Sequence, residues 1–85
     1  MYVIYTSSKK VEKKIDYYLD LRKDVHDKLI KLRNNPRTAC GAHPLKGELK
    51  GKWACWLGSN IRMIYAIDDL NRIIFIDDIG THKIY

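Results

Sequence analysis

Two stripes of apolar side chains at helical spacing run through the first half of the chain. The first stripe consists of Val11, Ile15, Tyr18 and Leu19, and the second of Val25, Leu29 and Leu32. Apolar positions three and four residues apart lie on one face of a helix. Arg22 interrupts the common face, so the pattern predicts a hairpin of two helices over residues 8–19 and 22–34. Pro36 ends the second helix, because proline cannot continue a helix and biases the residue before it away from helical angles.

The other apolar runs predict strands. β-branched and aromatic side chains at residues 2–5 favour a short first strand. Beyond a loop over 36–51, apolar runs at 53–57, 61–67 and 72–79 are separated by short turn sequences, which is typical of consecutive antiparallel strands. The resulting order is β-α-α-β-β-β. We therefore expect one α+β domain over residues 1–85, with the helix hairpin packed on a mainly antiparallel four-stranded sheet.

Alternation along the strand at 61–67 places Met63 and Tyr65 on one face and Arg62 on the other. Arg62 therefore faces either a cleft or solvent. The strand at 72–79 is apolar on both faces until Asp77, which is typical of a central position in a sheet. Asp77 and Asp78 resemble a catalytic pair, but neighbours on a strand point to opposite faces and cannot share a proton.

Charge narrows the class of partner. The 85 residues carry a net charge of +6, and the acidic residues of the second half fall mostly after residue 62. Such a balance favours nucleic acid or an acidic protein as partner, although a generally solvated basic surface has the same composition. Two cysteines make neither a disulfide framework nor a zinc site. With no leader and no apolar run long enough to span a membrane, we expect a cytoplasmic protein with reduced thiols.

Three stretches together resemble the RelE/ParE toxin superfamily, and most closely its YafQ-like branch of type II toxin–antitoxin systems. They are His-Pro-Leu-Lys-Gly-Glu-Leu-Lys-Gly-Lys-Trp at 43–53, Ile-Arg-Met-Ile-Tyr at 61–65 and Ile-Gly-Thr-His at 79–82. The resemblance implies a RelE-like fold and a toxin that cuts messenger RNA in the ribosomal A site. It also implies a cognate antitoxin, encoded beside the toxin, that holds it inactive.

The family's chemistry, as the resemblance implies it, needs no metal and no other cofactor. The ribose 2′-hydroxyl attacks the adjacent phosphate and leaves a 2′,3′-cyclic phosphate and a free 5′-hydroxyl. A base must take the 2′-hydroxyl proton, an acid must protonate the leaving oxygen, and cations must stabilise the phosphoryl oxygens. Histidine suits the proton transfers because its pKa is about 6.5, and the planar fork of arginine can bind two phosphate oxygens.

The motifs assign these roles to particular residues. His82 matches the catalytic histidine after Gly-Thr and is expected to be the general acid. His43 matches the histidine that begins the loop motif and is expected to act as base or to position the substrate. Arg62 matches the strand arginine that contacts the scissile phosphate. Tyr85 aligns near an aromatic residue of the family's tail, where it could stack on an RNA base or pack against the sheet.

A second group of residues is expected to bind substrate. It consists of Lys46, Lys50, Lys52 and Trp56. The lysines could replace the cations that the RelE-like branch carries on the first hairpin strand, or they could be ordinary solvated loop residues. Trp56 could line the substrate cleft or simply pack on the sheet.

The chain departs from the YafQ-like pattern at three places. Trp56 stands where that branch has a second histidine, Asn60 stands where it has an aspartate, and the tail is one residue shorter. Two alternatives therefore remain: a ParE-like toxin that inhibits DNA gyrase, and a catalytically impaired RelE-fold binding protein. In each toxin reading, an acidic and partly disordered antitoxin segment is expected to bind the basic face of the first helix, which carries Lys9, Lys10, Lys13 and Lys14.

Overall fold

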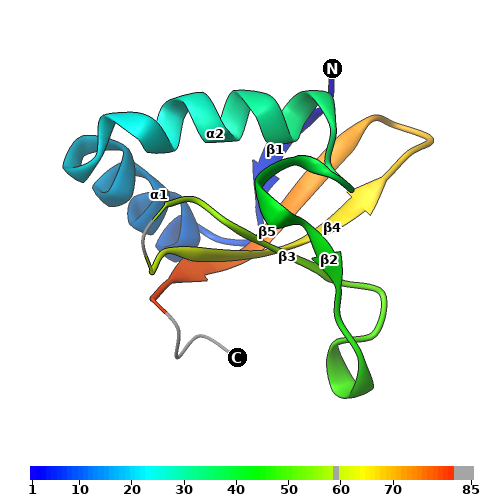
Figure 1. Ribbon diagram of the computed structural model, residues 1–85. Coiled ribbons are helices and arrows are strands. Elements are labelled where there is room, and N and C mark those ends of the chain that lie inside the picture. The colour runs from blue at the N-terminus through cyan, green and yellow to red at the C-terminus, as the bar shows by residue number, and fades with distance from the viewer. Residues whose placement is uncertain (59, 82–85) are drawn as a thin grey trace.

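Helices and strands form two layers in the computed structural model, which describes residues 1–58 and 60–81 (Figure 1). The elements follow in the order β1 (Val3–Thr6), α1 (Lys9–Leu21), α2 (Lys23–Asn34), η1 (Ala39–Gly41), β2 (His43–Pro44), η2 (Gly47–Leu49), β3 (Trp53–Trp56), β4 (Arg62–Asp68) and β5 (Ile73–Gly80). The strands lie in the order β1-β5-β4-β3-β2, with β1 parallel to β5 and the other pairs antiparallel. The predicted α+β class and the helix hairpin are confirmed.

The two helices begin and end where the sequence predicts. The Ser8 hydroxyl accepts a hydrogen bond from the Val11 amide at 3.2 Å, so it caps the start of α1. Arg22 has extended backbone angles of −138° and 122°, which end α1 and allow α2 to start in a new direction. Within the described residues, neither helix is long and apolar enough to cross a membrane.

The prediction of four strands is wrong by one. Within the predicted loop, His43 and Pro44 pair antiparallel with Ala54 and Trp53, which adds β2 at the edge of the sheet. Proline lacks an N–H and is tolerated in a sheet at such an edge. A two-residue strand that contains proline has no local periodicity to detect, so only its pairing with β3 reveals it.

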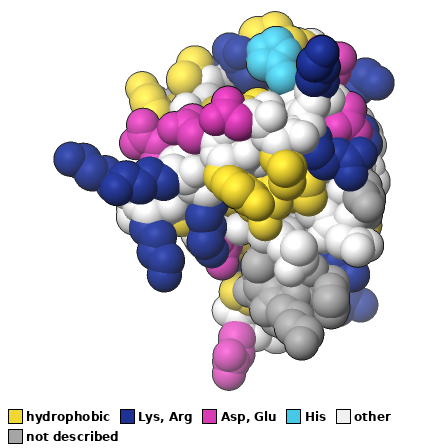
Figure 2. All heavy atoms as spheres, turned by 90° about the vertical axis from the view of Figure 1, so that its left-hand side faces the viewer, with side chains coloured by type: hydrophobic (Ala, Val, Ile, Leu, Met, Phe, Trp, Pro, Cys, Tyr) yellow, Lys and Arg dark blue, Asp and Glu magenta, His cyan; other side chains and the backbone are white. Residues whose placement is uncertain are grey.

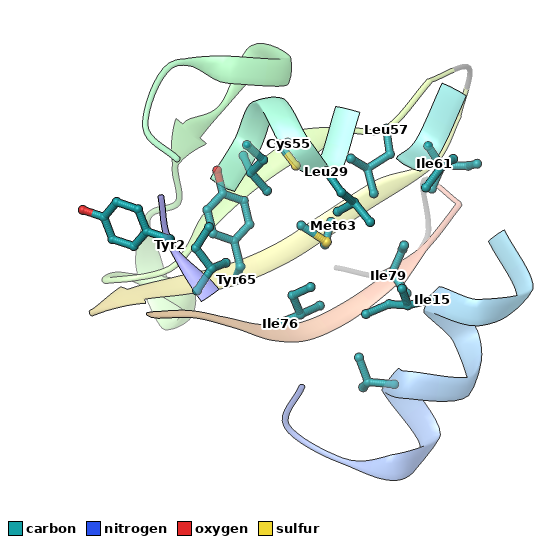
Figure 3. Close-up of a cluster of buried hydrophobic side chains, with 14 residues drawn as sticks. Tyr2, Ile15, Leu29, Cys55, Leu57, Ile61, Met63, Tyr65, Ile76 and Ile79 are labelled. Atoms are coloured by element: carbon teal, nitrogen blue, oxygen red, sulfur yellow. The ribbon is translucent and has the colours of Figure 1, made fainter. Parts of the chain in front are cut away.

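The core lies between the helices and one face of the sheet (Figure 3). The buried side chains of the sheet include Cys55, Met63, Tyr65, Ile74, Ile76 and Ile79, and those of α2 are Val25, Leu29 and Leu32. The Tyr65 hydroxyl donates to the Pro36 carbonyl at 2.6 Å, so even the polar end of this buried ring is bonded. Arg62 lies on the opposite face, as the alternation along β4 predicts.

One ionic cluster ties the β4–β5 turn to two distant segments. Arg37 donates two hydrogen bonds to the Asp69 carboxylate, at 3.0 Å and 2.8 Å, and the Tyr2 hydroxyl donates a third at 2.5 Å. The bonds from Arg37, and next those from Tyr2, lower the pKa of Asp69 to about 2. The bonds of this cluster therefore stabilise the fold most when the Asp69 carboxylate is ionised.

We expect this cluster to make folding stability depend on acidic pH. Because the pKa of Asp69 is lower in the folded chain than the value of about 3.9 in an unfolded one, its contribution is complete above about pH 4 and is lost as the pH falls toward 2. In urea unfolding, the free energy of unfolding of Asp69→Asn should therefore be lower than that of the parent at pH 6, and this difference should become smaller at acidic pH. Asp20→Asn, at an exposed site on α1, is the matched control. A difference between Asp69→Asn and the parent that is the same at every pH would contradict the expectation.

Candidate active site

One row of residues crosses the end of the sheet on the face turned away from the helices. Trp56 pairs with Arg62 across β3 and β4, and Arg62 pairs with Gly80 across β4 and β5. Their chain neighbours Cys55 and Met63 point into the core on the other face. Arg62 is therefore presented on the open face, directly opposite the residue at which β5 ends.

Arg62 is stacked on Trp56. The guanidinium carbon lies 4.1 Å from the centroid of the indole ring, and the Nε atom of Arg62 is buried. A cation–π contact of this kind contributes about 0.5 to 2 kcal/mol, more where water is excluded. It uses the flat face of the guanidinium, whereas the N–H groups that bind a phosphate lie in its plane. The stack therefore fixes the plane of the fork before any anion binds.

Gly41 supports this stack from the side. It has a φ of +65°, in the region that favours glycine, and a Cβ added there would lie 3.4 Å from Cδ1 of Trp56. A larger residue would therefore have a strained backbone, with its Cβ in van der Waals contact with the indole. The loop before β2 thus lies close to the ring on which Arg62 is stacked.

His43 is connected to the same loop. Its Nδ1 atom lies 3.1 Å from the Gly41 carbonyl oxygen. A carbonyl only accepts hydrogen bonds, so Nδ1 carries the hydrogen and Nε2 of the neutral ring is left as an acceptor. The exposed imidazole can therefore take a proton at Nε2. Gly41 is thus bonded to His43 through its carbonyl and lies near Trp56, the ring on which Arg62 is stacked.

The three predicted substrate-binding lysines have different environments. Lys52, directly before β3, forms an ion pair with Asp77 of β5. Lys46 and Lys50 are exposed in the segment between β2 and β3, which extends away from the sheet in Figure 1. Lys52 is thus partly neutralised, whereas Lys46 and Lys50 offer their charge at the edge of the molecule.

Two of the predicted catalytic residues, His82 and Tyr85, lie outside the described residues. The structure does describe the point at which the chain leaves the sheet before them. β5 ends at Gly80, whose cross-strand partner is Arg62, and Thr81 follows. The expected roles of His82 and Tyr85 therefore remain predictions.

The neighbouring acids are occupied by lysines. Asp77 pairs with Lys52, and Asp78 pairs with Lys14 of α1 at 2.8 Å. Among residues 1–58 and 60–81, no three His, Cys, Asp or Glu side chains are grouped so that they could hold a metal ion. Burial raises the pKa of the Cys55 thiol, which makes a thiolate nucleophile unfavourable there.

Sequence reasoning missed a groove beside this row. It has a volume of about 540 Å³ and lies between α1 and the end of β5. Its lining residues are Lys10, Lys13, Lys14, Tyr17, Tyr18, Ile79, Gly80 and Thr81. The spacing of lysines and tyrosines on the first helix indicated that they share one face. That this face lies against the end of β5 depends on the tertiary structure, so the sequence did not predict the groove.

Comparison with known proteins identifies the fold. No protein-family model and no curated protein matches the chain. Among solved structures, the YoeB–YefM toxin–antitoxin complex from Staphylococcus aureus matches with a TM-score of 0.74 and 19% identity, over 96% of this chain and 98% of the other. YafQ from E. coli matches with a TM-score of 0.65 and 20% identity, over 96% and 94%.

A third similar structure, the conserved hypothetical protein HP0892 from Helicobacter pylori, has a TM-score of 0.60 and 29% identity, with 96% of each chain covered. A YoeB/ParE toxin from Agrobacterium tumefaciens also matches, with a TM-score of 0.74. The predicted resemblance is therefore confirmed at the level of the fold, which is that of the RelE/ParE toxins.

Proposed function

We propose that this chain, which has the fold of the RelE/ParE toxins, is the toxin of a type II toxin–antitoxin system and cleaves messenger RNA on the ribosome. The observation that carries the proposal is the Arg62 guanidinium, which is stacked on Trp56 at the open end of the sheet. His43 is hydrogen-bonded to Gly41, which lies near the same indole ring. An arginine fork with a proton acceptor nearby is what phosphodiester cleavage by an internal hydroxyl requires.

In the proposed reaction, the ribose 2′-hydroxyl loses its proton to Nε2 of His43 as its oxygen bonds to the adjacent phosphorus. Arg62 holds the phosphoryl oxygens, on which negative charge increases. The bond from phosphorus to the 5′-oxygen then breaks, and His82 gives that oxygen a proton. The products are a 2′,3′-cyclic phosphate and a 5′-hydroxyl. The reaction is metal-independent in this proposal, because every proton and charge is handled by a side chain.

We further propose a cognate antitoxin as the partner that silences the toxin in the cytoplasm. Support comes from the similar fold of the YoeB–YefM toxin–antitoxin complex. The lysine-rich face of α1 has the charge that an acidic antitoxin segment would neutralise.

Induction in bacteria, with primer extension on cellular messages, tests the proposed activity. We expect growth arrest and new 5′ ends within translated codons, both abolished or strongly reduced by His82→Ala. Filamentation with DNA damage and uncut messages would instead indicate a ParE-like gyrase inhibitor. Normal growth with uncut messages would indicate a catalytically impaired binding protein, the alternative raised by Trp56 in place of a family histidine.

A further inference from the structure

The groove between α1 and the end of β5 exists because the two strands on that side differ in length. β1 pairs with β5 only as far as Ile76, whereas β5 continues to Gly80. Beyond Ile76 the edge of β5 that faces α1 is therefore not paired with β1. This edge forms one wall of the groove, and α1 forms the other. The result is an open channel of about 540 Å³.

The walls of this groove combine cations with aromatic rings. Lys10 and Lys13 are exposed on α1, two turns and one turn before Tyr17, respectively. Tyr17 is 59% exposed, and its ring meets that of Tyr18 edge to face at 5.1 Å between centroids. Ammonium groups bind phosphates, and an exposed ring stacks on a base, so this pairing suits a single-stranded nucleic acid.

The charge on α1 is divided into two bands. The lysines face the groove, while Glu12, Asp16 and Asp20 lie at four-residue spacing on an adjacent face of the helix. Figure 2, which views the molecule from the α1 side, shows acidic side chains in a band next to the projecting basic ones. The attraction for an anion is therefore concentrated at the groove.

The groove also shares one residue with the pairing row of the candidate active site. Gly80 lines the groove, and it is the cross-strand partner of Arg62. Directly paired residues on antiparallel strands have Cα atoms about 4.5 to 5.5 Å apart. An RNA strand that is bound at Arg62 and continues past the end of β5 would therefore meet the groove at Gly80.

We propose that this groove binds a nucleotide of the RNA strand beyond the scissile phosphate, past the end of β5. Lys10 and Lys13 bind its phosphate, and Tyr17 stacks on its base. Lys14 is bound to Asp78 and so anchors the helix wall to β5. This inference rests on the proposed function, in which Arg62 binds the scissile phosphate.

Binding of a short fluorescent single-stranded 2′-O-methyl RNA, which cannot be cleaved, tests this site. For the double variant Lys10→Gln/Lys13→Gln we expect weaker binding and a shallower dependence of log affinity on log salt, by about 0.7, because both lysines contact one phosphate and each phosphate neutralised on a single strand contributes about 0.7. For Tyr17→Leu we expect affinity to fall about fivefold or more. Lys23→Gln/Lys31→Gln, two exposed lysines of α2, is the control for net charge.

Several results would overturn the site. The first is that the groove variants bind RNA as tightly as the parent. The second is that the α2 control loses as much RNA affinity as the groove variants. The third is that the parent does not bind RNA at low salt. If the groove variants bind RNA like the parent but lose binding to an acidic peptide, the groove is a protein-docking surface instead. Message cutting by the parent, measured on ribosomes in parallel, separates this failure from that of the proposed function. Cutting that persists without groove-dependent binding rejects only the groove, and groove-dependent binding without cutting rejects only the nuclease.

Discussion

Arg62→Lys is expected to slow single-turnover cutting of ribosome-bound message by about 100-fold or more. The reason is geometric, because the charge is kept. Lysine has a compact ammonium that cannot bind two phosphate oxygens with one planar fork, nor stack on Trp56 as a guanidinium does. Removing one positioned donor to a developing oxyanion costs about 10²- to 10³-fold in other enzymes. Because Arg62 lies outside the core, the free energy of unfolding should fall by no more than the contribution of its stack on Trp56, about 0.5 to 2 kcal/mol.

The matched control is Arg72→Lys. Arg72 is exposed in the turn before β5, at the far end of the same hairpin. Arg72→Lys therefore replaces the same guanidinium by the same ammonium at a position away from the site. Ribosome pelleting should show that Arg62→Lys still associates with ribosomes. A cutting rate within a few-fold of the parent, with normal unfolding in urea, would exclude Arg62 from the reaction.

Most of the fold follows from local patterns in the sequence. The helices and the longer strands begin and end within two residues of the predicted positions, because their apolar periodicities are strong and Ser8, Arg22 and Pro36 mark the boundaries. The orientation of Arg62 follows from simple alternation along β4. These features depend on neighbours in the chain, so the chain alone predicts them.

What the sequence does not predict depends on distant segments. β2 is defined only by its pairing with β3, and the fit of Gly41 against Trp56 requires the positive φ of the loop. The groove arises from the different ends of β1 and β5. The stack of Trp56 on Arg62 also escaped prediction, although Trp56 itself was singled out. Its position opposite Arg62 depends on the register of β3 and β4.

Trp56 is expected to act through Arg62, by positioning its guanidinium. Trp56→Phe keeps an aromatic face and should cut within about threefold of the parent rate. Trp56→Ala removes the contact, which contributes about 0.5 to 2 kcal/mol, and should cut about 2- to 30-fold more slowly. Loss of packing alone could also slow the alanine variant, so unfolding in urea must be measured for both.

A double-mutant cycle distinguishes positioning from an independent contact with RNA. If Trp56 acts by holding the guanidinium, Trp56→Ala should have little further effect in an Arg62→Lys background, because the stacked group is already gone. Independent stacking on an RNA base would give the same fold-loss in both backgrounds. Trp56→His, which restores the residue typical of the YafQ-like branch, adds a second comparison. A faster Trp56→His variant with a new ionisation in its pH–rate profile would mean that this chain lacks a proton-transfer group, and that positioning of Arg62 replaces it only in part.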